Sequence, residues 1–340
     1  MRAAVVEKPG ELMVRQVPQL RMNPWQALVR IEACSICNHT DAEILAGRFG
    51  GTPYPLILGH ESAGRVIQVG ERVSRYRVGD QVLRPGAMYE DPTVGIASAW
   101  GGFAEYGLVG DVAAFQRDRP AERPHWSWEK QQVIPTDIEP GEATAIITLK
   151  ETLSLVKLHC PPGTRSLAIV GTGPVGRSFA FWARHLGLPI IAVYGRREKW
   201  RDEMLRLGAT HYIVAGDRSP VEAARAQGLG PFERAIEAVG SLAALETALS
   251  LVGSVGQVAP YGILPPASQW PAGCREALEK GIIRSVPVDE SVTHEEVLRL
   301  IAEGRVRLAD WISHRLPLAR IAEGFRLLEN KEATKVVIEM

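Results

Sequence analysis

The fold expected for the second half of the chain follows from one stretch, Ser166-Leu167-Ala168-Ile169-Val170-Gly171-Thr172-Gly173-Pro174-Val175-Gly176. Its first five residues form an apolar run typical of a strand buried in a parallel sheet. The G-x-G-x-x-G spacing follows at once, and a helix is expected to begin near Val175. Gly171 permits the tight turn, Gly173 lets the backbone approach a pyrophosphate, and Gly176 allows close helix–strand packing. The sequence therefore predicts that a dinucleotide binds at residues 171–176, including Thr172, Pro174 and Val175.

The segments around this stretch predict a two-domain α/β protein. Strand-like and helix-like segments alternate over residues 146–289, which predicts a doubly wound, Rossmann-type parallel sheet. Residues 1–145 instead contain short alternating segments, such as residues 27–32 and 64–70, separated by glycine and proline turns. We expect a β-rich domain there, completed by residues 290–340, and a surface loop in the proline-rich stretch 117–135.

The strand after the glycine helix indicates which nicotinamide cofactor binds. It reads Pro189-Ile190-Ile191-Ala192-Val193-Tyr194-Gly195-Arg196-Arg197. NAD enzymes usually end this strand with a carboxylate that accepts hydrogen bonds from the ribose 2′-hydroxyl. Tyr194 stands at or next to that position, and Arg196 and Arg197 suit a 2′-phosphate. The sequence favours NADP(H) over NAD(H), unless both arginines are merely solvated residues at a helix start.

Two short motifs in the first domain carry candidate metal ligands. One is Cys37, in Cys37-Asn38-His39-Thr40-Asp41, and the other is Gly59-His60-Glu61. Taken singly, a cysteine is more often a small buried apolar side chain. Together, thiolate, imidazole and carboxylate are ligands that suit Zn²⁺.

At these motifs the chain resembles the zinc-containing alcohol, polyol and sugar (sorbitol-type) dehydrogenases of the medium-chain dehydrogenase/reductase superfamily. The resemblance covers essentially the whole chain, in the family's order. It rests on the stretches Gly59-His60-Glu61-Ser62-Ala63-Gly64, Val78-Gly79-Asp80-Gln81-Val82, Gly101-Gly102-Phe103-Ala104-Glu105-Tyr106, the glycine turn, Glu237-Ala238-Val239-Gly240 and Lys335-Val336-Val337-Ile338.

The resemblance implies a GroES-like catalytic domain beside the Rossmann domain, and one catalytic zinc. Cys37 and His60 would be zinc ligands, and Glu61 would bind the zinc in some states and lie beside the ligands in others. Glu151 falls where sorbitol-dehydrogenase-like members place their remaining ligand, although it could be an ordinary surface helix residue. Val239 and Tyr261 lie on segments that correspond to those passing the nicotinamide.

The sequence departs from the family pattern in two places. Two residues rather than one separate Cys37 from the Thr-Asp pair, so the proton-relay hydroxyl corresponds to Thr40 only if the loop accommodates one residue. His39 is the alternative, because imidazole titrates near neutral pH. The segment from Arg84 to Asp91 contains no cysteine where relatives carry a four-cysteine lobe, so we expect no structural zinc.

Bulk composition narrows the function classes. The 340 residues contain 39 Lys+Arg and 39 Asp+Glu, so no general attraction to nucleic acid or to a membrane surface is expected. No apolar run reaches the roughly 18 residues of a membrane span, and the N-terminus lacks a signal-peptide core. We expect a cytoplasmic homodimer or homotetramer that acts on a small alcohol or polyol. The alternatives are a zinc-free quinone or enone reductase of the same superfamily and a non-catalytic NADPH-binding protein.

Overall fold

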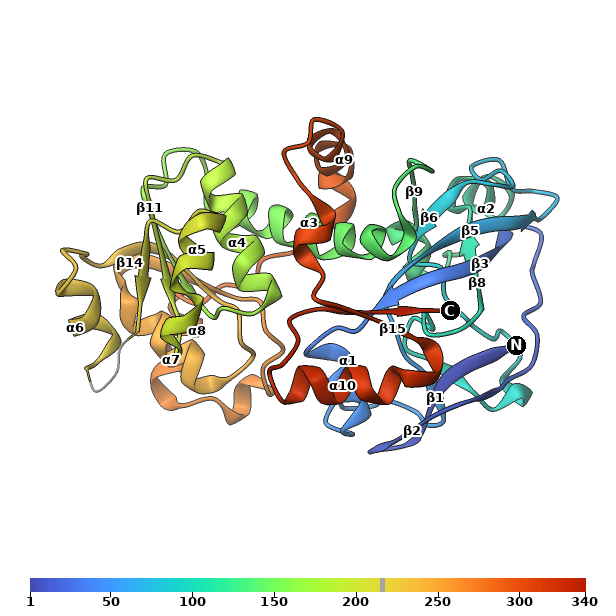
Figure 1. The fold of residues 1–340 in the computed structure, drawn as a ribbon, viewed down its shortest axis with the longest axis horizontal. Helices are drawn as coiled ribbons and strands as arrows, with labels where there is room; N and C mark the ends of the chain where they lie inside the picture. Colours follow the sequence, from blue (N-terminus) through green and yellow to red (C-terminus); the bar gives the residue numbers. More distant parts are fainter. Residues whose placement is uncertain (215–217) are drawn as a thin grey trace. The chain divides into compact units, whose positions relative to one another are not determined.

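The computed structural model describes residues 1–214 and 218–340, and it divides the chain into two compact units (Figure 1). Unit 1 consists of Met1–Thr148 and His294–Met340, and unit 2 of Leu149–Thr293. The long helix α3 (Pro140–His159) contributes residues to both units. Each unit has its own apolar core and is described separately below.

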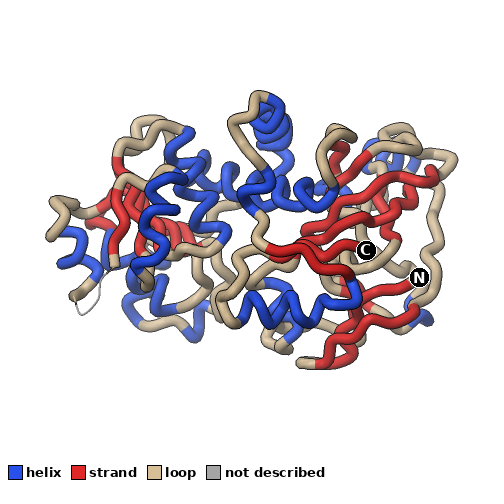
Figure 2. The backbone as a smooth tube through the Cα atoms, viewed as in Figure 1, coloured by secondary structure: helices blue, strands red, loops and turns tan. Residues whose placement is uncertain are grey.

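Unit 2 is built around a parallel sheet with the strand order β12-β11-β10-β13-β14. Helix α4 packs on β10 and β11, and α7 packs on β13 and β14, so helices flank the strands (Figure 2). The order reverses direction between β10 and β13, which is where doubly wound sheets bind ligands. The predicted Rossmann-type fold is confirmed. The elements are β10 (Ser166–Val170), α4 (Pro174–His185), β11 (Ile190–Tyr194), η3 (Glu198–Trp200), α5 (Arg201–Leu207), β12 (His211–Ile213), α6 (Pro220–Arg225), β13 (Phe232–Glu237), α7 (Leu242–Leu251), β14 (Val252–Pro260), η4 (Ala267–Gln269), α8 (Ala272–Glu279) and η5 (Glu290–Thr293).

Unit 1 is rich in strands, as predicted, and it includes the C-terminal residues. One sheet has the order β15-β16-β3-β5-β6-β9, with β8 also paired to β3, and a smaller sheet has the order β2-β1-β4-β7. The elements are β1 (Arg2–Lys8), β2 (Glu11–Gln16), β3 (Gln26–Ser35), α1 (Thr40–Leu45), β4 (Leu56–Ile57), β5 (Glu61–Val69), β6 (Gln81–Leu83), η1 (Pro92–Val94), β7 (Ala97–Ser98), β8 (Tyr106–Gly110), α2 (Val112–Asp118), η2 (Trp126–Lys130), β9 (Gln132–Ile134), α9 (His294–Ala302), η6 (Leu308–Trp311), β15 (His314–Pro317), η7 (Leu318–Arg320), α10 (Ile321–Glu329) and β16 (Val336–Glu339).

Three neighbouring strands of the larger sheet bring distant parts of the sequence together. Strand β3 pairs antiparallel with both β16 and β5, so that Ser35 lies between Val337 and Glu61. The residue before β16, the loop after β3 and the first residue of β5 therefore meet at one end of the sheet. This end of the sheet carries the candidate metal ligands.

The prediction of a surface loop over residues 117–135 is wrong in its second half. The segment contains η2 and strand β9, which pairs with β6. Trp128 is buried, and a Cβ on Gly110 would lie 1.8 Å from its ring, so the indole packs directly on the end of β8. The buried Gln131 side chain accepts a hydrogen bond from the Gly110 N–H and donates to the Leu108 carbonyl. These contacts fix the segment despite its prolines.

None of the described helices combines the length and the apolar character needed to cross a membrane.

Candidate functional site

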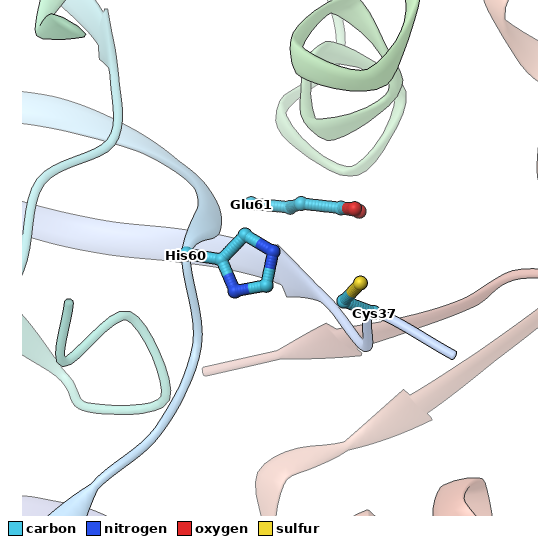
Figure 3. A group of neighbouring side chains, drawn as sticks. All are labelled: Cys37, His60 and Glu61. Atoms are coloured by element: carbon cyan, nitrogen blue, oxygen red, sulfur yellow. The ribbon is translucent and has the colours of Figure 1, made fainter. Parts of the chain in front are cut away.

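Cys37, His60 and Glu61 form a compact group in unit 1. One potential ligand atom from each lies within 4.8 Å of the others, and Figure 3 shows the sulfur, the imidazole and the carboxylate turned towards a common space. Cys37 follows β3, while His60 and Glu61 stand where the chain enters β5. Gly59 makes this entry possible, since its φ of +100° is left-handed and a Cβ would lie 2.8 Å from Phe103.

The buried Asp41 side chain contacts both Cys37 and His60. Its buried Oδ2 accepts a hydrogen bond of 2.9 Å from the Cys37 N–H, and its Oδ1 lies 3.4 Å from the Nδ1 of His60. A carboxylate at one imidazole nitrogen fixes the ring and leaves the other nitrogen for a cation. Sequence reasoning missed this role, although an acidic residue four positions after the cysteine was a readable signal.

Glu61 is held by a buried ion pair. Its Oε2 accepts from the Lys335 ammonium, and both side chains are about 5% exposed (5% and 6%). Its Oε1 accepts a hydrogen bond of 3.2 Å from the Thr148 hydroxyl. Lys335 was not predicted as a site residue, because 274 positions separate it from Glu61 and only the pairing of β16 with β3 brings it there.

The neighbouring charges shift the pKa values of Cys37 and His60 in opposite directions. Burial alone would raise the pKa of the Cys37 thiol, but the hydrogen bond and the charge of His60 lower it below its ordinary value. Burial opposes a charge on His60 too, yet Asp41 and Cys37 raise the pKa of the imidazole well above its ordinary value. A thiolate beside an imidazole and a carboxylate is the donor set that zinc prefers, so these residues fit that metal.

The glycine turn in unit 2 fits a dinucleotide phosphate. Gly171 has a φ of +129°, and a Cβ on Gly176 would lie 2.2 Å from the Gly171 carbonyl oxygen, so both positions require glycine. Nothing lies within 4 Å of a Cβ added to Gly173, which caps α4. The amino end of α4 therefore faces open space at the carboxyl end of β10, where backbone N–H groups attract a phosphate.

Comparisons with known proteins show similarity in both units. Residues 23–117 match the family described as alcohol dehydrogenase GroES-like domain, and residues 174–288 match zinc-binding dehydrogenase. The uncharacterized zinc-type alcohol dehydrogenase-like protein YdjL of Escherichia coli is 28% identical, over 97% of this chain and 95% of its own. The sorbitol dehydrogenase of Bombyx mori is 24% identical over 99% and 98%. The structure of alcohol dehydrogenase TADH from Thermus sp. ATN1 matches with a TM-score of 0.78 and 27% identity, covering 100% of this chain and 99% of the other.

The chain belongs to the zinc-type alcohol and polyol dehydrogenases of the medium-chain superfamily. Within such a dehydrogenase, the two predicted relay residues stand at the start of α1. Thr40 is its first residue, and His39 precedes it with a carbonyl that accepts from the Glu43 N–H. The choice between them as proton relay stays a prediction.

The predicted determinants of cofactor choice are the last residue of β11 and the arginines that follow it. Tyr194 is buried, and its hydroxyl donates to the Pro220 carbonyl at 3.4 Å. Arg196 and Arg197 are exposed. Glu198, which could have neutralised them, forms an ion pair with Arg201. The two guanidinium groups are therefore not neutralised by this carboxylate.

The predicted nicotinamide segments meet at Glu237, the last residue of β13. Its Oε1 accepts hydrogen bonds of 2.7 Å from the N–H groups of Val239 and Gly240, and its carbonyl accepts from the Tyr261 N–H. Burial raises the pKa of this carboxyl group. Glu237 thus joins the two segments, a role that sequence reasoning did not find.

Tyr261 also links this region to the predicted fourth metal ligand within unit 2. Its hydroxyl donates to the Oε2 of Glu151 at 3.0 Å, and its ring packs edge-on against Phe179. Glu151 is therefore held in a defined orientation on α3, and its role as a ligand stays a prediction.

Proposed function

We propose that the protein is an NADP-dependent, zinc-requiring dehydrogenase that oxidises an alcohol or polyol to a carbonyl compound. The observation that carries the proposal is the convergence of Cys37, His60 and Glu61 with their ligand atoms within 4.8 Å. Cys37 and His60 would hold the zinc ion, together with Glu151 or, in some states, Glu61. We expect one zinc per chain, because the segment from Arg84 to Asp91 has no cysteines.

The reaction transfers two electrons as a hydride from the carbinol carbon to the nicotinamide, and the hydroxyl proton leaves to solvent. Zinc bound at this site would act as a Lewis acid that stabilises negative charge on the carbinol oxygen. Asp41 orients the His60 imidazole, and Lys335 holds the Glu61 carboxylate. Either the Thr40 hydroxyl or the His39 imidazole would pass the proton outward.

Preference for NADP rests on the absence of a carboxylate at Tyr194 and on the two arginines that follow. A 2′-phosphate carries negative charge that guanidinium groups pair with, and one of them could do so bidentately. The nearby Glu198 carboxylate forms its ion pair with Arg201. The proposal is therefore that Arg196 and Arg197 receive the phosphate.

A zinc-free quinone or enone reductase is disfavoured by the same cluster. A reductase that uses no metal has no need of a lowered cysteine pKa beside a carboxylate-oriented histidine. A non-catalytic NADPH-binding protein has no need of the cluster either. As in relatives of this superfamily, we expect the chain to form a homodimer or homotetramer.

Metal content and turnover test the metal half of the proposal. We expect about one zinc per chain by elemental analysis, and alcohol-dependent NADPH formation at 340 nm that is lost on chelation and restored by Zn²⁺. Cys37→Ser should lose both the metal and the activity, whereas Cys274→Ser, a buried cysteine of unit 2, should keep both. Full activity in protein shown to be free of metal would refute the proposal.

Cofactor titrations test the second half. Arg196→Ala should weaken NADP⁺ binding by about tenfold, the effect of losing a contact of ~1.4 kcal/mol, and leave NAD⁺ binding unchanged. Arg165→Ala is the matched control, because Arg165 is exposed and lies at the amino end of β10, whereas Arg196 follows the carboxyl end of β11. Equal NADP⁺ affinity of wild type and Arg196→Ala would remove the arginine argument.

A further inference from the structure

A row of aromatic side chains extends from His60 within unit 1. The Trp100 ring lies 6.2 Å from the His60 imidazole, and the Trp126 ring lies 4.3 Å from Trp100 in an edge-to-face arrangement. His125 packs against Trp126 at 5.4 Å. We call Trp100 and Trp126 the aromatic wall. Trp100 lies next to His60, a predicted zinc ligand, and Trp126 lies farther from it.

The inner half of the wall is rigid. The Arg84 guanidinium lies 4.7 Å over the Trp100 ring and donates a hydrogen bond of 2.7 Å to the His60 carbonyl. Trp100 and Arg84 have φ angles of 71° and 60°, in the left-handed region that costs non-glycine residues energy. Such strain persists only where the surroundings fix it, and it gathers at binding and catalytic sites. The indole is therefore held in one position beside His60.

The outer half of the wall combines exposure with an anchored backbone. Trp126 is 58% exposed, whereas Trp128, two residues later in η2, is only 3% exposed and packs edge-on against Phe115. The His125 ring nitrogen accepts from the Ser127 N–H at the start of η2. The backbone is thus fixed from inside, while a large apolar ring is left to solvent next to the indole of Trp100.

Two polar side chains beside the wall have identified hydrogen-bond partners. The Arg84 guanidinium donates to the His60 carbonyl, and His125 Nδ1 bonds to the Ser127 hydroxyl at 2.8 Å. Substrate hydroxyls placed against the indole faces would lose water without gaining equivalent hydrogen bonds. Ring faces and edges, in contrast, pack favourably on indoles at 4.5–7 Å between centroids, the range typical of aromatic pairs.

We infer that the aromatic wall selects alcohols whose carbinol carbon carries a cyclic or aryl substituent, in preference to linear polyols. The inference rests on the proposed function, because it takes the carbinol oxygen to lie at the Cys37–His60–Glu61 group. Trp100 then meets the substituent first, and Trp126 covers its outer part. Both residues are specificity determinants.

Saturation-transfer difference NMR tests the binding without requiring turnover. The zinc-loaded protein with NADPH, which cannot oxidise an alcohol, is mixed with 1-phenylethanol, 2-propanol and sorbitol at equal concentrations. We expect the phenyl protons to show the strongest saturation, to lose it at least threefold in Trp126→Ala and to keep most of it in Trp126→Phe. Leu158→Ala, at an exposed leucine of unit 2, is the control that should match wild type. Equal signals in wild type and Trp126→Ala, or a sorbitol signal as strong as that of 1-phenylethanol, would overturn the inference.

Turnover separates this inference from the proposed function. The ratio of kcat/KM for 1-phenylethanol to that for 2-propanol should be about tenfold lower in Trp126→Ala than in wild type. Leu158→Ala should leave this ratio unchanged. An unchanged ratio in Trp126→Ala overturns the inference while the dehydrogenase activity stands. If no alcohol is oxidised by the zinc-loaded protein, the proposed function fails, and the NMR result still decides whether the wall binds rings.

Discussion

Replacing Lys335 by Met tests the buried charges around the metal site. Lys335 pairs with Glu61, and both side chains are almost fully buried, at 5% and 6% exposure. Methionine keeps the volume of the lysine stem but removes the ammonium group, which leaves the Glu61 carboxylate with only the Thr148 hydroxyl as a neutral partner. Removing one member of a buried pair costs about 3–5 kcal/mol, because the other charge stays uncompensated.

The expected loss is measurable as a shift in melting temperature. For a domain of 150–250 residues, each kcal/mol lowers Tm by about 2–4 °C, so the metal-free Lys335→Met protein should melt roughly 6–20 °C below wild type. The matched control is Lys280→Met, since Lys280 forms an exposed pair with Glu276, at 62% and 61% exposure. An exposed pair of this kind contributes about 0.2–1 kcal/mol, so the control should melt close to wild type.

A second substitution identifies the cause of the loss. Glu61→Gln removes the uncompensated charge but keeps an oxygen for Thr148, so the double variant Lys335→Met/Glu61→Gln should melt above Lys335→Met alone. Added Zn²⁺ should also narrow the gap between Lys335→Met and wild type, because the cation would compensate the carboxylate. Calorimetry of metal-free and zinc-loaded protein measures both effects. The reasoning is refuted if Lys335→Met costs no more than Lys280→Met, or if Glu61→Gln restores nothing.

Three further predictions concern unit 2. Gly173→Ala should fold normally, because an added Cβ meets nothing within 4 Å, but it should bind dinucleotide at least tenfold more weakly. Gly176→Ala should bind dinucleotide weakly too, and its Tm should be lower, because its Cβ would lie 2.2 Å from a backbone oxygen. Equal NADP⁺ affinities of Gly173→Ala and wild type in calorimetric titration would count against a phosphate at this turn. Tyr261→Phe should lower the unfolding free energy in urea by about 1.5–3 kcal/mol, the usual value of a hydrogen bond to a charged group such as Glu151; an unchanged midpoint would contradict this. Burial lowers the pKa of His159 to about 4, below the ~6.5 of an unfolded histidine, so stability is lost as pH falls from about 6.5 to 4, and His159→Gln should flatten the fall of Tm over that range.

The sequence predicted those parts of the site that depend on local signals. The turn after β10 needs glycine at residues 171 and 176 for reasons of backbone geometry, so its conformation was predictable from the spacing. Cys37 and His60 could be proposed as metal ligands from the sequence because cysteine and histidine are metal-binding residue types and stand here in the family's order. Asp41 was within reach of the same reasoning, since it belongs to the quoted motif.

Other parts of the site depend on contacts between distant segments, which spacing does not reveal. Lys335 reaches Glu61 only because β16 and β5 flank β3. Glu237 acts through two loops that meet at the end of β13. The stretch 117–135 looked like a loop because of its prolines, but the burial of Trp128 against Gly110 outweighs them. In each case tertiary packing decides what the local pattern leaves open.

The charges that meet at the end of β3 give a reason for a lysine beside the candidate metal ligands. Among the side chains that touch one another through their charged groups, Cys37 as thiolate, Asp41 and Glu61 carry three negative charges, and Lys335 carries one positive charge. A metal bound to His60 requires the neutral imidazole, so the proton that Asp41 and Cys37 favour there must leave. The other four groups then sum to a charge of two negative units. Without Lys335, a bound zinc ion would leave a buried negative charge, which protein interiors tolerate poorly. The ammonium group thus offsets one of the two carboxylates of unit 1 that support the candidate site.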